Sequence, residues 1–501
     1  MKKILLSIAA LGLGMGLAAN VASAEMSFSA TGIYQIQGFY VSEGSNSSQG
    51  MQVAVFDKNI AMDSDGNLYQ YESKANDMWN HLFYVMPELK VNDNITMKSE
   101  IRFIDRDVWG NDPAYGNFNN RANQNVNDMW LRQLYMNYDS PIGMWSIGRM
   151  LGGAWGSKFL DSAGNRDRIK WNLDKLLPEN FGASLIYQKT AEYDAFYGGT
   201  DEADAASYYA GMSYKADWGQ TDAALWYSRY DKDYNAAANV AGMNPILTAI
   251  YGSPVDDYDN TELWLNGNYK FGGFNIASEF DWAFAGTDAY NNDLKSFGFM
   301  LDANTQLDAF TLGGLFFWLS GDDDPLDGDN KGWVGRNGVG ADYNPFAIAT
   351  GDYMGLLGPD KNGYLGAVTS ILGIPGSPYE PLEDLVGGGN INPGAMALAG
   401  YAMYQFDEKL SFNGAVGYIW ADKVPIEGID DGMGWEVDLG LSYKLLDNLT
   451  YSATAAYMAP GSMFDDLAKE YNAVAEGLGF ADLATGTNNI YLLLHNLTMT
   501  F

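Results

Sequence analysis

The residues best suited to chemistry are basic side chains in the first third of the chain. Lys98, Glu100 and Arg102 alternate in one stretch, and Arg168 and Lys170 alternate in another. In extended backbone, alternate residues share a face, so each stretch presents a charged face that could select charged solutes. The alternative is that the arginines pair with nearby carboxylates and only brace the structure. The candidate set is Lys98, Glu100, Arg102, Arg106, Arg132, Arg149, Arg168 and Lys170.

A second group of candidates is acidic and lies in the segment "GDDDPLDGDNKG". Carboxylate oxygens suit calcium or magnesium, although this spacing is not that of an EF-hand loop. We predict a weak calcium site in this segment. The alternative is an acidic loop that is only solvated. We predict no other cofactor. The five candidate ligands are Asp322, Asp323, Asp324, Asp327 and Asp329.

The composition excludes several classes of chemistry. The chain has no cysteine and only two histidines, His81 and His495, which excludes thiol catalysis and disfavours a histidine-rich metal site or a Ser-His-Asp triad. The formal net charge is −34, from 63 acidic and 29 basic residues, and such a surface repels nucleic acid. We therefore expect neither an enzyme nor a nucleic-acid-binding protein.

The elements that carry these residues are predicted to be β-strands. Aromatic residues make up 14% of the chain, which also has 58 glycines. Mean hydropathy is −0.20 although 47% of residues are hydrophobic, because polar residues balance them. In "ITMKSEIRFI", Ile95, Met97, Ile101 and Phe103 share one face, and the polar residues share the other. This period of two is typical of strands with one apolar face.

Short turns and long polar connections alternate strictly along the chain. The predicted short turns lie at 92–94, 139–143, 174–180, 216–219, 271–273, 304–306, 407–409 and 447–448. The longest connection, 321–393, contains apolar stretches and is expected to fold into or over one end of the molecule, or onto a partner subunit. Short helices are expected at 244–252 and 464–480. The rhythm predicts an all-β, up-and-down antiparallel meander of about eighteen strands, or sixteen.

Both ends of the chain point to export and to lipid. Residues 1–24 have two lysines, an apolar run and an Ala-Ser-Ala site, as in a secretory signal peptide, which leaves 25–501 as a single domain. In the last segment, Tyr491, Leu493, Leu497, Met499 and Phe501 form one apolar face. A sheet in lipid must close into a barrel to pair its edges, so we predict a transmembrane β-barrel in which the last strand pairs with the first.

With the signal peptide, this rhythm and the ending "LTMTF", the chain resembles the outer-membrane porins of Gram-negative bacteria. The strand number is similar to that of the substrate-type porins. The resemblance implies a homotrimer in the outer membrane, in contact with lipid and lipopolysaccharide. It also implies that Tyr491, Leu493, Leu497, Met499 and Phe501 are the signal read by the barrel-assembly machinery. His495 departs from that apolar row.

The predicted function is passive diffusion of small hydrophilic solutes or ions through a water-filled lumen. The connection at 156–168 either folds inward and narrows the channel or is an ordinary outer loop. The basic set, facing acidic residues across the lumen, would create a transverse field at the constriction. Alternatives are a barrel that exports a polymer or sheathes a periplasmic redox partner, a barrel enzyme, and a soluble all-β protein whose enclosed face is apolar.

Overall fold

The structure is a computed structural model. It describes residues 26–47, 50–53, 58–62, 68–72, 74–109, 129–152, 156, 159–160, 164–191, 205–230, 258–287, 293–322, 327–333, 346–349, 393–424, 428–477 and 486–501. The predicted signal peptide, 1–24, lies outside the described residues and stays a prediction, as does the helix expected at 244–252.

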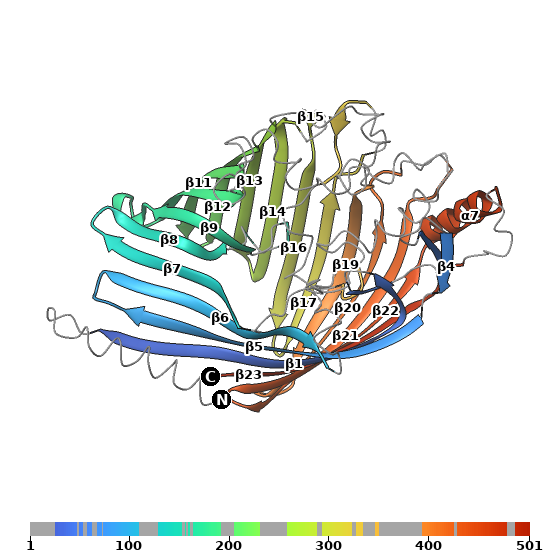
Figure 1. The fold of residues 1–501 in the computed structure, drawn as a ribbon, viewed down its shortest axis with the longest axis horizontal. Helices are drawn as coiled ribbons and strands as arrows, with labels where there is room; N and C mark the ends of the chain where they lie inside the picture. The colour runs from blue at the N-terminus through green and yellow to red at the C-terminus, as the bar shows by residue number, and fades with distance from the viewer. Residues whose placement is uncertain are drawn as a thin grey trace.

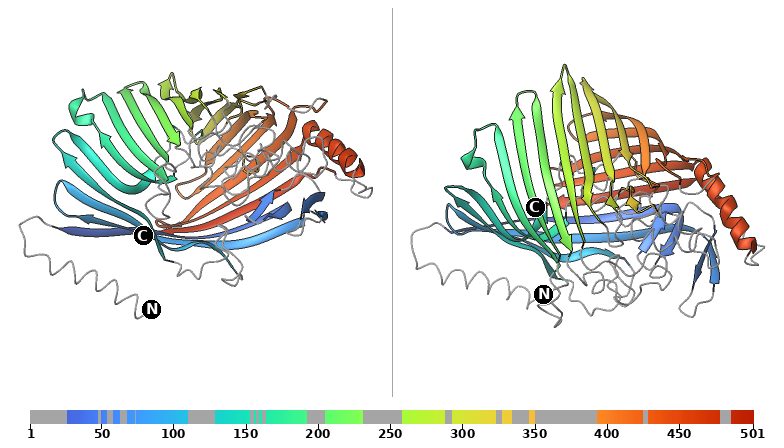
Figure 2. Two further views of the ribbon diagram at one scale, coloured as in Figure 1. Left: turned by 45° about the horizontal axis from the view of Figure 1, so that its top comes forward. Right: turned by 90° about the horizontal axis from the view of Figure 1, so that it is seen from above.

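The fold is a closed antiparallel barrel of eighteen strands, as predicted (Figures 1 and 2). Each strand pairs with its neighbour along the chain, and the last pairs with the first. In ring order the strands are β1 (Ser27–Ser47), β5 (Lys74–Lys90), β6 (Ile95–Val108), β7 (Trp130–Ser140), β8 (Gly143–Gly152), β9 (Gly164–Asn172), β10 (Phe181–Ala191), β11 (Ala205–Ala216), β12 (Gly219–Tyr230), β13 (Tyr258–Phe271), β14 (Phe274–Gly286), β16 (Phe297–Leu307), β17 (Phe310–Leu319), β19 (Ala395–Gln405), β20 (Leu410–Trp420), β21 (Gly432–Leu446), β22 (Leu449–Pro460) and β23 (Ile490–Thr500).

The remaining elements lie in the connections. They are β2 (Gly50–Val53), the hairpin of β3 (Lys58–Met62) and β4 (Leu68–Glu72), the parallel pair β15 (Asp293–Leu294) and β18 (Asp329–Asn330), the 3-10 helix η2 (Asp174–Leu176) and the helix α7 (Ser462–Gly477). Helix α7 confirms the prediction at 464–480 and lies at the end of the strands away from the C-terminus (Figure 2). No helix in the described part of the chain is long and apolar enough to cross a membrane.

The short turns fall where the sequence predicts them, with one exception. The prediction of a turn at 304–306 is wrong, because β16 continues to Leu307 and the turn is formed by Asp308 and Ala309. Asp308 has φ 54°, a left-handed conformation that aspartate tolerates better than most residues. Asn304, which resembles a turn residue in the sequence, instead faces inward and donates to Asp302.

Polar and apolar side chains alternate across the barrel wall, as β21 illustrates. Trp435, Val437 and Leu439 are 56%, 41% and 64% exposed, whereas the intervening Glu436 and Asp438 are 0% and 5% exposed. The apolar side chains therefore point away from the barrel and the carboxylates point into it. A water-soluble barrel has the opposite arrangement, because its enclosed face forms the apolar core. This wall suits a barrel that is surrounded by lipid.

The barrel closes where its two ends meet, with β1 lying between β5 and β23 (Figure 1). The N–H of Gly32 donates to the carbonyl of Phe501 at 2.8 Å, and the N–H of Phe501 donates to that of Gly32 at 3.1 Å. A β-carbon at Gly32 would lie 2.3 Å from Cζ of Phe501, so the aromatic ring occupies the space that this glycine leaves. The predicted pairing of the first and last strands is thus confirmed.

Candidate functional site

The candidate site is the enclosed face of the barrel, and one arc of it is acidic. The arc runs from β12 to β21, and its carboxylates project inward from positions that alternate with outward apolar residues. The buried carboxylates are those of Asp222, Glu262, Glu279, Asp281, Asp302, Glu436 and Asp438. Clustered acids of this kind favour cations over anions in a water-filled channel.

A basic arc lies on β6, β7 and β9, where the sequence placed its candidates. Nε of Arg102 is 2.8 Å from Oε1 of Glu100, and Nη1 of Arg132 is 3.5 Å from the same oxygen. The guanidinium of Arg102 also lies over the ring of Tyr84, 5.4 Å from its centroid. One buried carboxylate is therefore shared by two arginines.

The other inward cations extend the same arc. Nε of Arg168 donates to Oε1 of Gln188 at 2.7 Å, and Gly152 gives the guanidinium of Arg168 its space, since a β-carbon there would lie 2.2 Å from Nη1. Lys170 shares the inward face of β9 with Arg168. Lys98 pairs with Glu88 at 3.0 Å, and both side chains remain well exposed.

The basic and acidic arcs lie on different walls. In ring order β16 is nine strands from β6, half of the eighteen, so Asp302 lies across the barrel from Arg102. The bracing interpretation also holds in part, because Arg102 and Arg132 do pair with Glu100.

One predicted lining residue, Arg149, is not brought into this group, and the place of a second, Arg106, is not described. Arg149 lies on the outer face of β8, on the same parity as the exposed Ile147 and Leu151, and its Nη1 is 2.8 Å from Oδ2 of Asp167. The structure thus corrects the expectation that Arg149 lines the lumen. Arg106 belongs to β6, but its side chain lies outside the described residues.

The connection between β8 and β9 reaches across the barrel. The N–H of Leu160 donates to Oε2 of Glu279 on β14 at 3.1 Å, and the ring of Phe159 lies 4.9 Å from that of Phe317 on β17. Phe159 and Leu160 are both buried. These described residues support the inward alternative for 156–168, whose last five residues already belong to β9.

A second inward segment, Phe346–Ala349, belongs to the long connection after β17. The N–H groups of Ile348 and Ala349 donate to the two carboxylate oxygens of Glu436 at 2.6 and 2.9 Å. The N–H of Ala347 donates to Oδ2 of Asp438 at 3.2 Å. Two buried carboxylates of the wall thus hold three consecutive backbone donors, and this part of 321–393 folds into the barrel as expected.

The two inward segments meet in one apolar cluster. Phe317 contacts Phe159 from one segment and Phe346 from the other, with ring centroids 4.9 and 6.4 Å apart. In the described part of the chain, these segments contact Glu279 on β14, Phe317 on β17, and Glu436 and Asp438 on β21. The lumen is therefore narrowed from the acidic side.

A cavity of about 550 Å³ with a mixed polar and apolar lining adjoins the second segment. Oη of Tyr401 donates to Oδ1 of Asp302 at 2.8 Å, and the Tyr401 ring has room because the facing Gly313 lacks a side chain. The polar residues of its wall are Asn268, Asp302, Asn304, Tyr401, Asn413, Asp438 and Thr454. This volume and lining suit a small hydrophilic molecule.

Sequence reasoning did not single out Glu279, Asp302, Glu436 and Asp438. Alternation along β21 could have placed Glu436 and Asp438 on the inward face, opposite Trp435 and Leu439. No local signal identifies the loop that they bind, because Ile348 lies 88 residues from Glu436 along the chain.

The described aspartates of the predicted calcium site lie in the connection that follows β17, not in the strands of the barrel. They form contacts with lysine residues. Asp322 accepts the N–H of Lys331 at 3.0 Å, Asp327 pairs with Lys331, and Asp329 pairs with Lys295. The Lys331 ammonium lowers the pKa of Asp327, and Asp327 in turn raises the pKa of Lys331. Asp323 and Asp324 lie outside the described residues. In the described part of the chain, no group of three or more His, Asp or Glu residues is arranged to hold a metal.

Four residues of the predicted assembly signal lie on the outer face of β23 and the fifth, Phe501, directly follows the strand; Tyr491, Leu493 and Phe501 are well exposed. His495 shares this face, and its ring packs edge-on against Trp79, 4.5 Å between centroids. His495, which interrupts the apolar row, therefore packs with Trp79 on the outer surface of the barrel.

No protein-family profile and no curated protein matches this chain. Solved structures with a similar fold include the outer membrane protein OpdK of Pseudomonas aeruginosa, at 10% identity and a TM-score of 0.46, over 94% of this chain and 98% of that one. Pseudomonas aeruginosa OpdL is 9% identical with a TM-score of 0.48, over 94% and 98%. OmpT of Vibrio cholerae, in its trimer form, is 10% identical with a TM-score of 0.36, over 95% and 99%.

Proposed function

We propose that this protein is a porin of a Gram-negative outer membrane, through which small hydrophilic solutes or ions diffuse passively. The observation that carries the proposal is the alternation along β21, with Leu439 exposed on the outside and Asp438 buried inside. A barrel wall with an apolar outer face and a charged inner face is suited to enclose a water-filled lumen while its outside contacts lipid.

Selectivity comes from the two charged arcs and from the inward segments. The acidic arc, the larger of the two, favours cations. Arg102, Arg132, Arg168 and Lys170 set a positive wall opposite it, and a dipolar solute passing between the walls would be oriented by their field. The apolar cluster at Phe317 restricts the cross-section on the acidic side.

A channel that exports a polymer or sheathes a redox partner needs a wide bore free of loops. Phe159 and Phe346, both buried within the barrel, count against this alternative. No observation favours a barrel enzyme. The assembly signal on β23, the homotrimer, contact with lipopolysaccharide and a calcium ion near Asp322, Asp327 and Asp329 remain predictions.

Planar-bilayer recording tests the proposal. We expect stepwise conductance from the purified protein and, under a salt gradient, a reversal potential of the sign that indicates cation preference. Protein that is folded, as judged by a heat-sensitive shift in gel mobility, yet gives no conductance would contradict the proposal. An anion preference would leave the porin intact but overturn the role given to the acidic arc.

A further inference from the structure

The outer surface of β8 to β12 contains an apolar pit with tyrosines along one edge. The pit has a volume of about 450 Å³, and its lining includes Ala210, which is flanked by Leu185 and Leu225 on the neighbouring strands. Trp171 pairs with Leu185 on the other side, and its ring stacks on that of Trp145, 4.8 Å between centroids. Leu185 and Leu225 are well exposed, so the pit opens outward.

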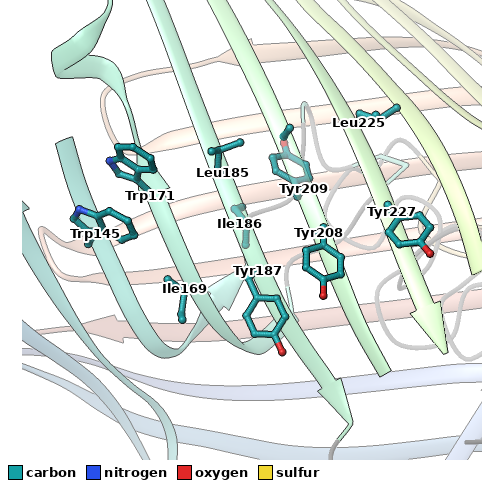
Figure 3. A pocket seen from close by; sticks show the side chains of 11 residues that line it. Trp145, Ile169, Trp171, Leu185, Ile186, Tyr187, Tyr208, Tyr209, Leu225 and Tyr227 are labelled. Atoms are coloured by element: carbon teal, nitrogen blue, oxygen red, sulfur yellow. The ribbon is translucent and has the colours of Figure 1, made fainter. Parts of the chain in front are cut away.

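A row of aromatic residues lies next to the pit in the direction of the long connections. Tyr187, Tyr208 and Tyr227 are direct register partners on β10, β11 and β12, and Figure 3 shows their rings in a line across the three strands. Oη of Tyr227 donates to Oδ2 of Asp259 at 2.9 Å. Tyrosines concentrate where the apolar layer of a membrane meets its polar surface.

A row of charges follows directly beyond the tyrosines, two residues further along each strand. Paired neighbours give the order Arg149, Asp167, Lys189, Ala206, Arg229 and Asp259 from β8 to β13. Three cations thus face outward with two carboxylates, in a chain of formal net charge −34. Ala206, between Lys189 and Arg229, leaves space on the wall between the two cations.

The spacing of these rows matches a lipid standing against the wall. At about 3.3 Å per residue, the charged row lies roughly 13 Å from Ala210, and the five strands from β8 to β12 span about 19 Å. An acyl chain would fill the pit while a phosphate group met the cations. The width accommodates several chains side by side, more than one two-chain phospholipid covers.

We infer that the outer face of β8–β12 binds a phosphate-bearing lipid with several acyl chains, such as the lipid anchor of lipopolysaccharide, with a chain in the pit at Ala210 and a phosphate between Lys189 and Arg229. This inference rests on the proposed function only in placing the barrel in an outer membrane. Arg149 extends the cationic row and is held in place by Asp167.

The chain provides a matched control for the pit. Ala455 on β22 is also exposed and lies between two outward leucines, Leu439 and Leu493, in the same register arrangement as Ala210. Its neighbours toward the long connections are Tyr457 and Ala459, with Trp435 opposite Ala459 and no cation in these positions. Comparing the substitutions A210L and A455L therefore distinguishes a loss of lipid binding at the pit from a general effect of adding leucine to the outer surface.

The test is native mass spectrometry of the full-length protein in detergent, titrated with bisphosphorylated lipid A, with the same lipid after phosphate removal, and with phosphatidylglycerol. We expect the first lipid to bind at least tenfold more tightly than the other two. A210L fills the pit and K189Q/R229Q removes the two cations that would meet a phosphate, so each should weaken its binding about tenfold or more, whereas A455L should not.

Equal binding by A210L and A455L, or no effect of K189Q/R229Q, would overturn the inference. Equal binding of phosphatidylglycerol would contradict the assignment to a multi-chain lipid. A change of oligomeric state in A210L without a change in lipid binding would assign the surface to a second copy of the chain. Folding of each variant is checked by the gel-mobility shift, and conductance, which these outward substitutions should not alter, reports separately on the porin proposal.

Discussion

The N–H of Ile348 donates a 2.6 Å hydrogen bond to Oε1 of Glu436, a fully buried carboxylate 88 residues further along the chain. The next residue, Ala349, uses the other oxygen of the same carboxylate. One side chain of the wall thus fixes the position of a segment inside the lumen, and the width of the pore depends on that attachment.

Replacing Glu436 with glutamine should loosen this attachment. The amide offers one acceptor oxygen where the carboxyl group has two, so one of the two backbone N–H groups at Ile348 and Ala349 loses its acceptor, and a buried donor without a partner costs about 1–3 kcal/mol. We expect E436Q to show larger or more fluctuating single-channel conductance. E408Q, in the exposed turn between β19 and β20, is the control and should conduct as the wild type does. Unchanged conductance in E436Q would show that the segment does not limit the current.

The arginines that share Glu100 should influence ion preference. R102Q/R132Q removes two inward positive charges and should shift the reversal potential toward stronger cation selectivity, while E100Q should shift it toward anions. R149Q is a matched control, because Arg149 faces outward and should leave selectivity unchanged. A shift in R149Q about half as large as that in R102Q/R132Q would mean that the charges act at long range and not as a lining.

Assembly should depend on the fit between Gly32 and Phe501. A β-carbon at Gly32 would lie 2.3 Å from the Phe501 ring, whereas one at Gly400 has nothing within 4 Å. We expect G32V to reduce the fraction of heat-modifiable barrel severalfold, and G400A to have no such effect. The measurement is the gel-mobility shift of membrane-extracted protein. A fully assembled G32V barrel would rule out this contact as a determinant of closure.

The ion pair between Asp327 and Lys331 should hold its segment over a wide pH range. The pKa of Asp327 is lowered, so its contribution is complete above about pH 4 and disappears as the pH falls through the lowered value. The pKa of Lys331 is raised, so its contribution is complete below about pH 10 and disappears as the pH rises through the raised value.

Hydrogen exchange of residues 327–333 should therefore show constant protection between about pH 5 and pH 9, after correction for intrinsic rates. K331M should lower that protection throughout the range, and K409M, in an exposed turn, should not. Protection that varies with pH in this range would assign the stability of the segment to other groups.

Much of the barrel could be predicted because its signals are local. Alternation places Leu493 outside and Asn496 inside from the sequence alone, and most turns contain residues that tolerate turn conformations. Alternation does not place Arg132 on either face of its strand, and the structure gives the physical reason. A β-bulge adds one residue between Leu131 and Gln133, which face Ile101 and Glu100, so two outward leucines are three residues apart, at 131 and 134.

The attachments within the lumen could not be predicted, because they join residues far apart in the sequence. Leu160 reaches Glu279 across 119 residues, and an acidic side chain carries no local indication of which backbone donors it accepts. Arg149 shows a related limit: once the start of a strand is uncertain by one residue, the inward and outward faces exchange.

The meeting of β1 with β23 has a consequence for how the molecule is made. Gln35 donates to Thr498 across 463 residues, so the first strand lacks one of its two neighbours until the whole chain has been synthesised and exported. Throughout that interval two rows of unpaired backbone groups are open to any other extended chain. Biogenesis must therefore keep an unfinished sheet from aggregating, and closure between such distant segments will be slow without assistance.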